Sequence, residues 1–270
     1  MSDVPEPTTA AGRAGLAALL AEPGRGLIAL DFDGTLSHIV PQPPTARPSD
    51  GVIEALVALS PLVGTLAIIT GRPARWVAED AGLRDVPQLV ILGQYGAERW
   101  SAGELSVPDE PPGISAVRQA LPLLLADADP DVWVEDKALS LVVHTRRAAD
   151  PAAELAALTD PVRVVAERHG LEANAGRNVL EVRLPGVDKG GALESLAGEA
   201  SPTAVLFAGD DLGDLPGFDA VDRLRAQGIP GLTVASASPE TSAVSDRADI
   251  VADGPDGIAG LLGALVAALR

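Results

Sequence analysis

The chain has 270 residues, 47% of them hydrophobic and only 3% aromatic, so it is long enough for one large domain or two small ones with cores of mostly Ala, Val, Leu and Ile. Its formal net charge of −18 at pH 7 argues against nucleic acid as a partner, because an acidic surface repels a phosphate backbone. It contains no cysteine, which excludes disulfides and thiol catalysis.

The first ten residues are acidic and contain prolines. We expect them to be disordered, within an N-terminal extension of residues 1–23 that carries a short helix at 15–22. They lack the basic start of a signal peptide. The apolar stretch 258–269 is too short to cross a bilayer, which takes about 20 residues, and predicts a core-facing helix. We therefore expect a cytoplasmic protein without a membrane partner.

In the first part of the chain, apolar runs that predict buried strands alternate with stretches that predict helices. The strands are predicted at residues 27–30, 65–69 and 89–92, and the helices at residues 50–60 and 73–81. Ser49 or Asp50 is expected to cap the first of these helices. The alternation predicts parallel pairing and an open, doubly wound (Rossmann-like) α/β sheet.

The pattern changes after Ser106, where V-P-D-E-P-P-G predicts a linker. Helices are then predicted at residues 114–126 and 152–169, and strands at residues 132–135, 139–144, 171–174 and 179–183. Strands adjacent in sequence pair antiparallel, so this part predicts a smaller α+β cap domain. The alternating pattern then resumes with a helix at 189–197. The sequence thus predicts a discontinuous core of residues 24–106 and 186–270, interrupted by a cap of residues 107–185.

Two acids follow the first buried strand, in L-I-A-L-D-F-D-G-T-L. Asp31 and Asp33 are two residues apart, so in extended backbone their side chains point the same way, and Gly34 permits a tight turn. Two adjacent carboxylates repel each other, and a bound Mg²⁺ would remove that repulsion. For the pair alone, an Asx-turn is an equally good interpretation.

Polar clusters also follow three other predicted elements. They are Thr70 with Gly71 and Arg72, Lys189 at a helix start, and Asp210 with Asp211 and Asp214. Ligands bind at the carboxyl ends of the strands in open parallel sheets. These residue types suit phosphoryl transfer: one carboxylate attacks phosphorus, a second acid protonates the leaving alcohol, and a hydroxyl and an ammonium hold the phosphoryl oxygens. Taken singly, each cluster is also explained as an ordinary turn, a surface lysine or a solvated acidic loop.

The motifs D-F-D-G-T, I-T-G-R, D-K-G and G-D-D-L-G-D occur in this order at predicted strand ends. In this the chain resembles the haloacid dehalogenase (HAD) superfamily of phosphatases, which implies a HAD core with the inserted cap. The resemblance implies that Asp31 is the nucleophile and Asp33 the general acid/base. It also implies that Thr70 and Lys189 bind the phosphoryl group.

The same resemblance implies a Mg²⁺ cofactor. Its ligands would be Asp31, the backbone carbonyl of Asp33, and Asp210; Asp211, counted among the metal-binding residues, and Asp214 would act at longer range or through water. In trehalose-6-phosphate phosphatases, which the chain also resembles, the corresponding loop usually reads G-D-D-x-T-D-E-D, and this chain lacks its Thr and its last acids. We therefore expect metal binding to persist, with the groups that surround the metal ligands held less firmly.

Three further stretches are similar to trehalose-6-phosphate phosphatases: G-Q-Y-G-A-E before the cap, and E-D-K-A-L-S-L-V-V-H-T-R and G-R-N-V-L-E-V-R-L-P-G-V-D-K-G within it or at its end. The residues assigned to substrate binding are Gly71, Arg72, Glu135, Lys137, Arg146 and Glu181. For Glu135, Lys137 and Glu181, the residues alone favour another interpretation, namely a solvated face of the cap sheet. We expect His144 to be a packed strand-end histidine, and His38 and His169 to be structural or on the surface.

The resemblance therefore implies a Mg²⁺-dependent phosphatase that converts trehalose 6-phosphate to trehalose and phosphate through an aspartyl-phosphate on Asp31. One alternative is a HAD phosphatase that acts on another glycosyl phosphate, such as sucrose or glucosylglycerol phosphate. Another is a non-catalytic HAD-fold regulatory module. The expected partner is a sugar-phosphate substrate, and the chain is expected to be monomeric.

Overall fold

The computed structural model describes residues 4–137, 139–176, 178–237 and 242–270. The chain divides into two compact units, one of Met1–Val107 with Asp188–Arg270 and one of Pro108–Val187. We call them the core unit and the cap unit. The predicted fold class is confirmed, because a largely parallel sheet with helices on both faces accompanies a separate antiparallel sheet.

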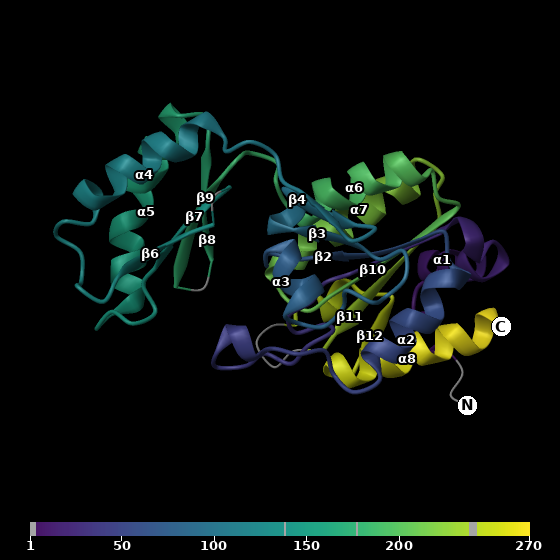
Figure 1. The fold of residues 1–270 in the computed structure, drawn as a ribbon. Helices are drawn as coiled ribbons and strands as arrows, with labels where there is room; N and C mark the ends of the chain where they lie inside the picture. Colours follow the sequence, from purple (N-terminus) through teal and green to yellow (C-terminus); the bar gives the residue numbers. More distant parts are fainter. Residues whose placement is uncertain (1–3, 138, 177, 238–241) are drawn as a thin grey trace. The chain divides into compact units, whose positions relative to one another are not determined.

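The core unit is built on a sheet with the strand order β12-β11-β10-β1-β2-β3-β4-β5 (Figure 1). Its strands are β1 (Gly26–Leu30), β2 (Thr65–Ile69), β3 (Val90–Gly93), β4 (Glu98–Ser101), β5 (Glu104–Ser106), β10 (Ala204–Gly209), β11 (Gly231–Ser236) and β12 (Ile250–Ala252). The strands from β12 to β3 run parallel, and β4 and β5 add an antiparallel edge. Every residue of β1 and β10 is buried, which explains their continuous apolar sequences.

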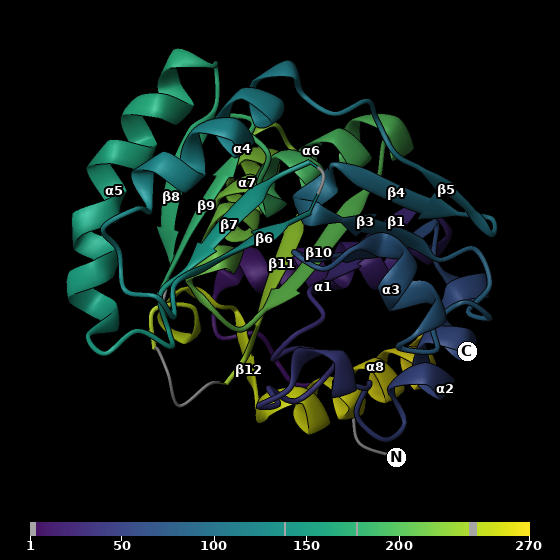
Figure 2. The same ribbon diagram turned by 60° about the vertical axis from the view of Figure 1, so that its left-hand side comes forward.

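Helices cover both faces of this sheet (Figure 2). The helices on one face are α6 (Lys189–Ala200) and α7 (Leu215–Ala226). Those on the other are α1 (Ala10–Ala21), α2 (Val52–Leu59), α3 (Ala74–Glu79) and α8 (Gly254–Leu269). The N-cap of α2 is Gly51, without a side-chain cap, so the prediction that Ser49 or Asp50 caps it is wrong.

Helix α1 begins five residues before the predicted helix at 15–22, because Thr9 caps it. The Thr9 hydroxyl accepts a hydrogen bond from the amide of Gly12 at 2.9 Å and donates one to the Asp249 carboxylate. The amide of Thr8 donates to the carbonyl of Asp249 at 2.8 Å. Residues 4–10 are therefore anchored on the core, whereas the expectation of disorder for residues 1–3 lies outside the described residues.

The cap unit is an antiparallel sheet in the order β6-β7-β9-β8, with two helices on one face (Figure 1). Its elements are α4 (Pro112–Leu124), β6 (Trp133–Asp136), β7 (Leu141–His144), α5 (Pro151–Arg168), β8 (Glu172–Gly176) and β9 (Val179–Arg183). Alternate strand residues, including Leu141, Val143, Leu180 and Val182, pack against the helices.

The opposite face of the cap sheet carries the polar residues. Glu135 pairs in register with Val142, and Val142 with Glu181, so the two acids lie in one row across three strands. The predicted strand at 139–144 begins only at Leu141, because the amide of Lys137 donates to the carbonyl of Ser140 and closes a turn.

Candidate active site

The carboxyl ends of the neighbouring strands β2, β1 and β10 carry three of the predicted site residues. Thr70 follows β2, Asp31 follows β1 and Asp210 follows β10. Because these strands pair in parallel, their ends meet at one edge of the sheet. Lys189 is the first residue of α6, whose N-terminus Asp188 caps. The side chains of Asp31, Thr70, Lys189 and Asp210 are all buried.

Lys189 lies at the centre of the cluster. Its Nζ is 2.6 Å from Asp31 Oδ1 and 2.6 Å from Asp214 Oδ1. Burial favours the neutral amine, yet the negative charges of Asp214 and Asp31 raise the pKa of Lys189 well above its ordinary value. The ammonium therefore stays charged and holds the Asp31 carboxylate in a fixed orientation.

Three carboxylates are gathered beside this ammonium. Asp31, Asp210 and Asp214 each offer an oxygen, and these oxygens lie within 4.8 Å of one another. Burial, with the charges of Asp214 and Asp211, raises the pKa of Asp210 to about 7. Burial likewise raises the pKa of Asp31, although Lys189 opposes the shift. Buried carboxylates this close together, with oxygen donors only, fit a hard divalent cation such as Mg²⁺.

The turn after β1 allows Asp210 to approach this closely. Gly34 has a φ of +78°, and a Cβ there would lie 2.1 Å from Asp210 Oδ2, so a side chain at this position would collide with the carboxylate. The Ser236 hydroxyl donates to the carbonyl of Gly34 at 2.6 Å and ties the turn to β11.

The G-D-D-L-G-D loop is organised by its last aspartate. Asp214 Oδ2 accepts hydrogen bonds from the amides of Asp210, at 2.9 Å, and Asp211, at 3.1 Å. The exposed Asp211 side chain accepts from the amide of Gly213 at 2.8 Å and completes a capping box. Asp214, expected to act only at longer range, thus lies among the clustered carboxylates, while the role of Asp211 at the metal stays a prediction.

Asp33 is paired with Arg72. Arg72 Nε and Nη2 donate to the two carboxylate oxygens of Asp33, each at 2.6 Å, in the bidentate geometry of strong Arg–carboxylate pairs. The guanidinium lies 4.0 Å from the ring centroid of Trp76, and its Nη1 donates to the carbonyl of Pro43 at 2.8 Å. The predicted contact of Arg72 with the substrate stays a prediction, since its donors are engaged within the protein.

Thr70 and Gly71 lie against Tyr95, a residue that was not predicted to belong to the site. The Thr70 hydroxyl accepts from the amide of Arg72 at 3.2 Å, and its carbonyl accepts from the amide of Tyr95 at 2.9 Å. A Cβ on Gly71 would lie 2.7 Å from the Tyr95 hydroxyl oxygen. The Tyr95 backbone is left-handed, with a φ of 59°, which is uncommon outside glycine and was not predicted from the sequence G-Q-Y-G.

On the polar face of the cap sheet, Glu181 is buried in an ion-pair cluster. Its Oε1 is 3.8 Å from Lys137 Nζ and accepts a hydrogen bond from the Ser140 hydroxyl at 3.1 Å. Its Oε2 is 3.5 Å from Arg183 Nη1. Glu181 is only 9% exposed. It therefore does not lie on a solvated sheet face, as the residues alone had favoured.

Glu135 is more open and interacts with His144, whose Nε2 lies 2.9 Å from Glu135 Oε2. The side-chain hydrogen bond from His144, assisted by the charges of Lys137 and Arg146, lowers the pKa of Glu135. Arg146 itself is exposed. Of the other histidines, His38 is exposed beside Asp256, at 3.1 Å, and His169 is exposed at the end of α5.

The model of the trehalose-phosphatase family matches residues 29–250. The chain belongs to this family. A trehalose-phosphate phosphatase from Mycobacterium marinum is 34% identical over 239 residues, which cover 82% of this chain and 57% of the relative. The chain thus spans about half the length of the curated relatives that it matches.

Two solved structures show the shared fold. The C-terminal domain of C. albicans trehalose-6-phosphate phosphatase superposes with a TM-score of 0.75 at 23% identity, covering 98% of this chain and 99% of that one. A haloacid dehalogenase-like hydrolase from Bacteroides thetaiotaomicron superposes with a TM-score of 0.64 at 17% identity, covering 89% and 99%. Among the described residues, no helix combines the length and apolarity needed to span a membrane.

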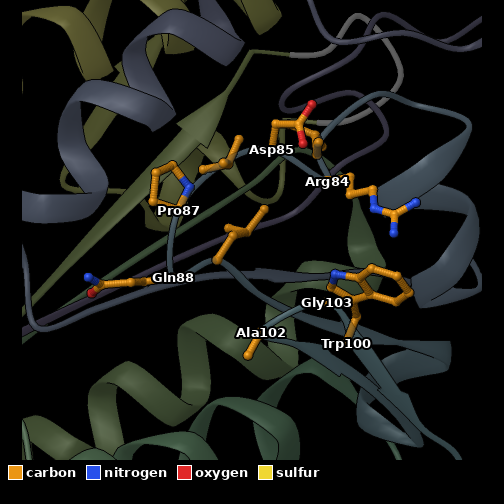
Figure 3. Close-up of a pocket in the computed structure, with 10 residues that line it drawn as sticks. Arg84, Asp85, Pro87, Gln88, Trp100, Ala102 and Gly103 are labelled. Atoms are coloured by element: carbon orange, nitrogen blue, oxygen red, sulfur yellow. The ribbon is translucent and has the colours of Figure 1, made fainter.

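A hollow of about 180 Å³ lies elsewhere on the core unit (Figure 3). Its lining comes from the segment that precedes β3, including Leu89, and from the turn between β4 and β5, with Trp100 against it. Both segments are at the end of the sheet where β3 begins, opposite the edge that carries Asp31. The hollow is therefore separate from the candidate active site.

Proposed function

We propose that this protein hydrolyses trehalose 6-phosphate to trehalose and phosphate, with Mg²⁺, through an aspartyl-phosphate on Asp31. The observation that carries the proposal is the buried cluster in which Lys189 joins Asp31 to Asp214 beside Asp210, in a chain of the trehalose-phosphatase family. We further propose that it acts in the cytoplasm. We also propose that it is a monomer, because a high net negative charge disfavours self-association.

In the first step, a carboxylate oxygen of Asp31 attacks phosphorus. The new Asp31–phosphorus bond forms as the bond from phosphorus to the sugar oxygen breaks, and Asp33 gives its proton to that leaving oxygen. In the second step, Asp33 takes a proton from water as the water oxygen attacks phosphorus. Phosphate leaves, and Asp31 regains its carboxylate.

Thr70 and Lys189 support both steps by binding the phosphoryl oxygens as negative charge develops on them. Lys189 already touches the nucleophile, so it is suited to bridge Asp31 and the phosphoryl group. Asp31, Asp210 and Asp214, with the backbone carbonyl of Asp33, would hold Mg²⁺. When bound, the ion would neutralise charge on the phosphoryl oxygens and the carboxylates.

The cap residues Glu135, Lys137, Arg146 and Glu181 are proposed to bind sugar hydroxyls. Carboxylates accept hydrogen bonds from hydroxyl groups, and ammonium or guanidinium groups donate to them. The ion pairs around Glu181 support this role, because they fix its carboxylate before a ligand arrives.

The test is phosphate release with Mg²⁺ from trehalose 6-phosphate, glucose 6-phosphate, sucrose 6-phosphate, glucosylglycerol phosphate and p-nitrophenyl phosphate. We expect a strong preference for trehalose 6-phosphate. Preference for another glycosyl phosphate would keep the core chemistry and overturn the assignment of the substrate. If the whole panel is silent while Mg²⁺ binds, the protein is a non-catalytic module.

The Asp31→Asn variant is the control in this assay. We expect it to lose at least about 10³-fold in kcat, because an amide is a poor nucleophile and the reaction would have to proceed without the covalent intermediate. Circular dichroism should show an unchanged fold. Activity near the wild-type level in this variant would exclude Asp31 as the nucleophile.

A further inference from the structure

His144 occupies an unusual position in the cap unit. It ends β7 and pairs in register with Trp133 of β6. The imidazole and indole rings are parallel within 3°, with their centroids 4.4 Å apart, and the Arg147 guanidinium lies 4.4 Å from the Trp133 ring centroid. The His144 side chain is 13% exposed. Its ring is thus held in one orientation by aromatic stacking.

The two ring nitrogens of His144 have different surroundings. Nε2 lies 2.9 Å from Glu135 Oε2. A glutamate is ionised at neutral pH, and the hydrogen bond with His144 lowers the pKa of Glu135 further, so its carboxylate only accepts. Nδ1 is buried and has no hydrogen-bond partner among the residues that the structure describes. A hydrogen on Nδ1 would be buried without an acceptor among those residues, whereas a hydrogen on Nε2 has the Glu135 carboxylate to donate to, so the geometry favours the Nε2–H tautomer.

The hydrogen bond acts on a side chain that is largely open to solvent. The Glu135 carboxylate is 48% exposed, and an exposed glutamate samples several rotamers. The buried Glu181, in contrast, is held by Ser140, Lys137 and Arg183. For Glu135, the hydrogen bond with His144 is the largest cause of the lowered pKa.

We propose that His144 is a positioning residue: fixed by its stacking on Trp133, it donates from Nε2 to Glu135 and holds that carboxylate in the orientation that accepts sugar hydroxyls. The inference rests on the proposed function, since it needs Glu135 to bind the sugar. His144 itself has no polar atom left for the substrate, because Nε2 is engaged and Nδ1 is buried.

Two substitutions separate the parts of this arrangement. His144→Phe keeps a ring to stack on Trp133 and removes the donor, whereas His144→Gln keeps an N–H donor near the position of Nε2 and removes the ring. We expect His144→Phe to raise KM for trehalose 6-phosphate about tenfold, the order set by freeing one ordered side chain at a binding site, with kcat little changed. His144→Gln should recover most of that loss.

The same variants are then compared on p-nitrophenyl phosphate and in a Glu135→Ala background. We expect His144→Phe to change kcat/KM for the aryl phosphate less than twofold, and to add nothing once Glu135 is gone. Equal losses on both substrates, or a full additional loss in the Glu135→Ala background, would mean that His144 has a structural role instead, and would overturn the proposal.

A spectroscopic measurement tests the pair without any turnover. The chain has only 3 histidines, so their imidazole ¹⁵N signals are resolvable by NMR, and His144→Phe assigns one set. We expect His144 to be the Nε2–H tautomer at neutral pH, with an Nε2 shift that moves in Glu135→Gln. The Nδ1–H tautomer would overturn the proposal. If the tautomer is as expected but no glycosyl phosphate is hydrolysed, the pair stands and the proposed function fails.

Discussion

At Asp33, both carboxylate oxygens are engaged by a single guanidinium. The guanidinium of Arg72 also packs on the Trp76 ring. This contact holds the two N–H groups that donate to Asp33 in a fixed orientation. A group that protonates a leaving alcohol must be held at the correct angle. In the proposed mechanism, in which Asp33 protonates the leaving alcohol, Arg72 would therefore serve to orient Asp33.

Arg72→Lys replaces the fork by a single ammonium and should loosen Asp33. We expect kcat for trehalose 6-phosphate to fall at least about tenfold. The loss on p-nitrophenyl phosphate should be much smaller, because p-nitrophenolate leaves without a proton. Measuring kcat on both substrates tests this, with Arg75→Lys as the matched control, since Arg75 is an exposed residue paired with Glu79. Equal losses on the two substrates would contradict it.

Lys189 balances buried negative charge, so its removal should be felt in stability as well as in activity. We expect Lys189→Met to lower the free energy of unfolding by about 3–5 kcal/mol in the presence of EDTA, because Asp31 and Asp214 lose their buried cation. The double variant Lys189→Met/Asp214→Asn should recover part of this loss. Urea unfolding measures both, and a loss below about 1 kcal/mol in the single variant would show that the ammonium is not needed for charge balance.

The meeting of Asp31, Thr70 and Asp210 followed from sequence, because parallel strands end at one edge and a polar residue just after each strand must lie there. Lys189 starts helix α6 and was expected there from the D-K-G motif. Two further pairings did not follow from sequence. The approach of Asp214 to Lys189 depends on the path of the G-D-D-L-G-D loop, and the Asp33–Arg72 pair depends on side-chain conformations. Neither leaves a periodic signal, so only the structure reveals them.

Among the elements, buried apolar strands were predictable, whereas the start of helix α1 was not. The buried strands β1 and β2 match the predicted runs closely, because a strand covered on both faces is a continuous apolar segment. Helix α1 was expected to begin later. Its true start depends on Asp249, which is distant in sequence and fixes Thr8 and Thr9 through tertiary contacts.

Helix α1 also shows where packing outweighs helix propensity. A Cβ on Gly15 would lie 1.9 Å from the carbonyl oxygen of Gly231. Propensity alone predicts that Gly15→Ala stabilises the helix by about 1 kcal/mol. We expect the opposite, a loss of about 1–3 kcal/mol, because the backbone of β11 cannot yield without disturbing the sheet.

Thermal or urea unfolding of Gly15→Ala decides the sign. The matched control is Gly24→Ala, since a Cβ on Gly24 would meet nothing within 4 Å and should change stability by less than about 0.5 kcal/mol. A stabilised Gly15→Ala variant would show that α1 does not pack against β11 as described.

For the whole molecule, the net charge of −18 adds repulsion among the charged groups of a single chain. Raising NaCl from 10 to 150 mM shortens the Debye length from about 30 to about 8 Å. We therefore expect the midpoint of thermal unfolding, measured with EDTA, to rise by a few degrees. A falling midpoint would mean that exposed ion pairs, such as those of Arg247 with Asp219 and Asp222, contribute more than the overall repulsion.

The pairing of β1 with β10 has a consequence for how the protein is made. The cap lies within one continuous stretch, Pro108–Val187, and has all of its strands as soon as that stretch leaves the ribosome. The strand before Asp31 can pair early with Thr65–Ile69 on one side, but its neighbour on the other side, Ala204–Gly209, is synthesised only after the cap. Asp31 is thus among the earliest core residues to emerge, and it gains Lys189, Asp210 and Asp214 only after the cap has been synthesised.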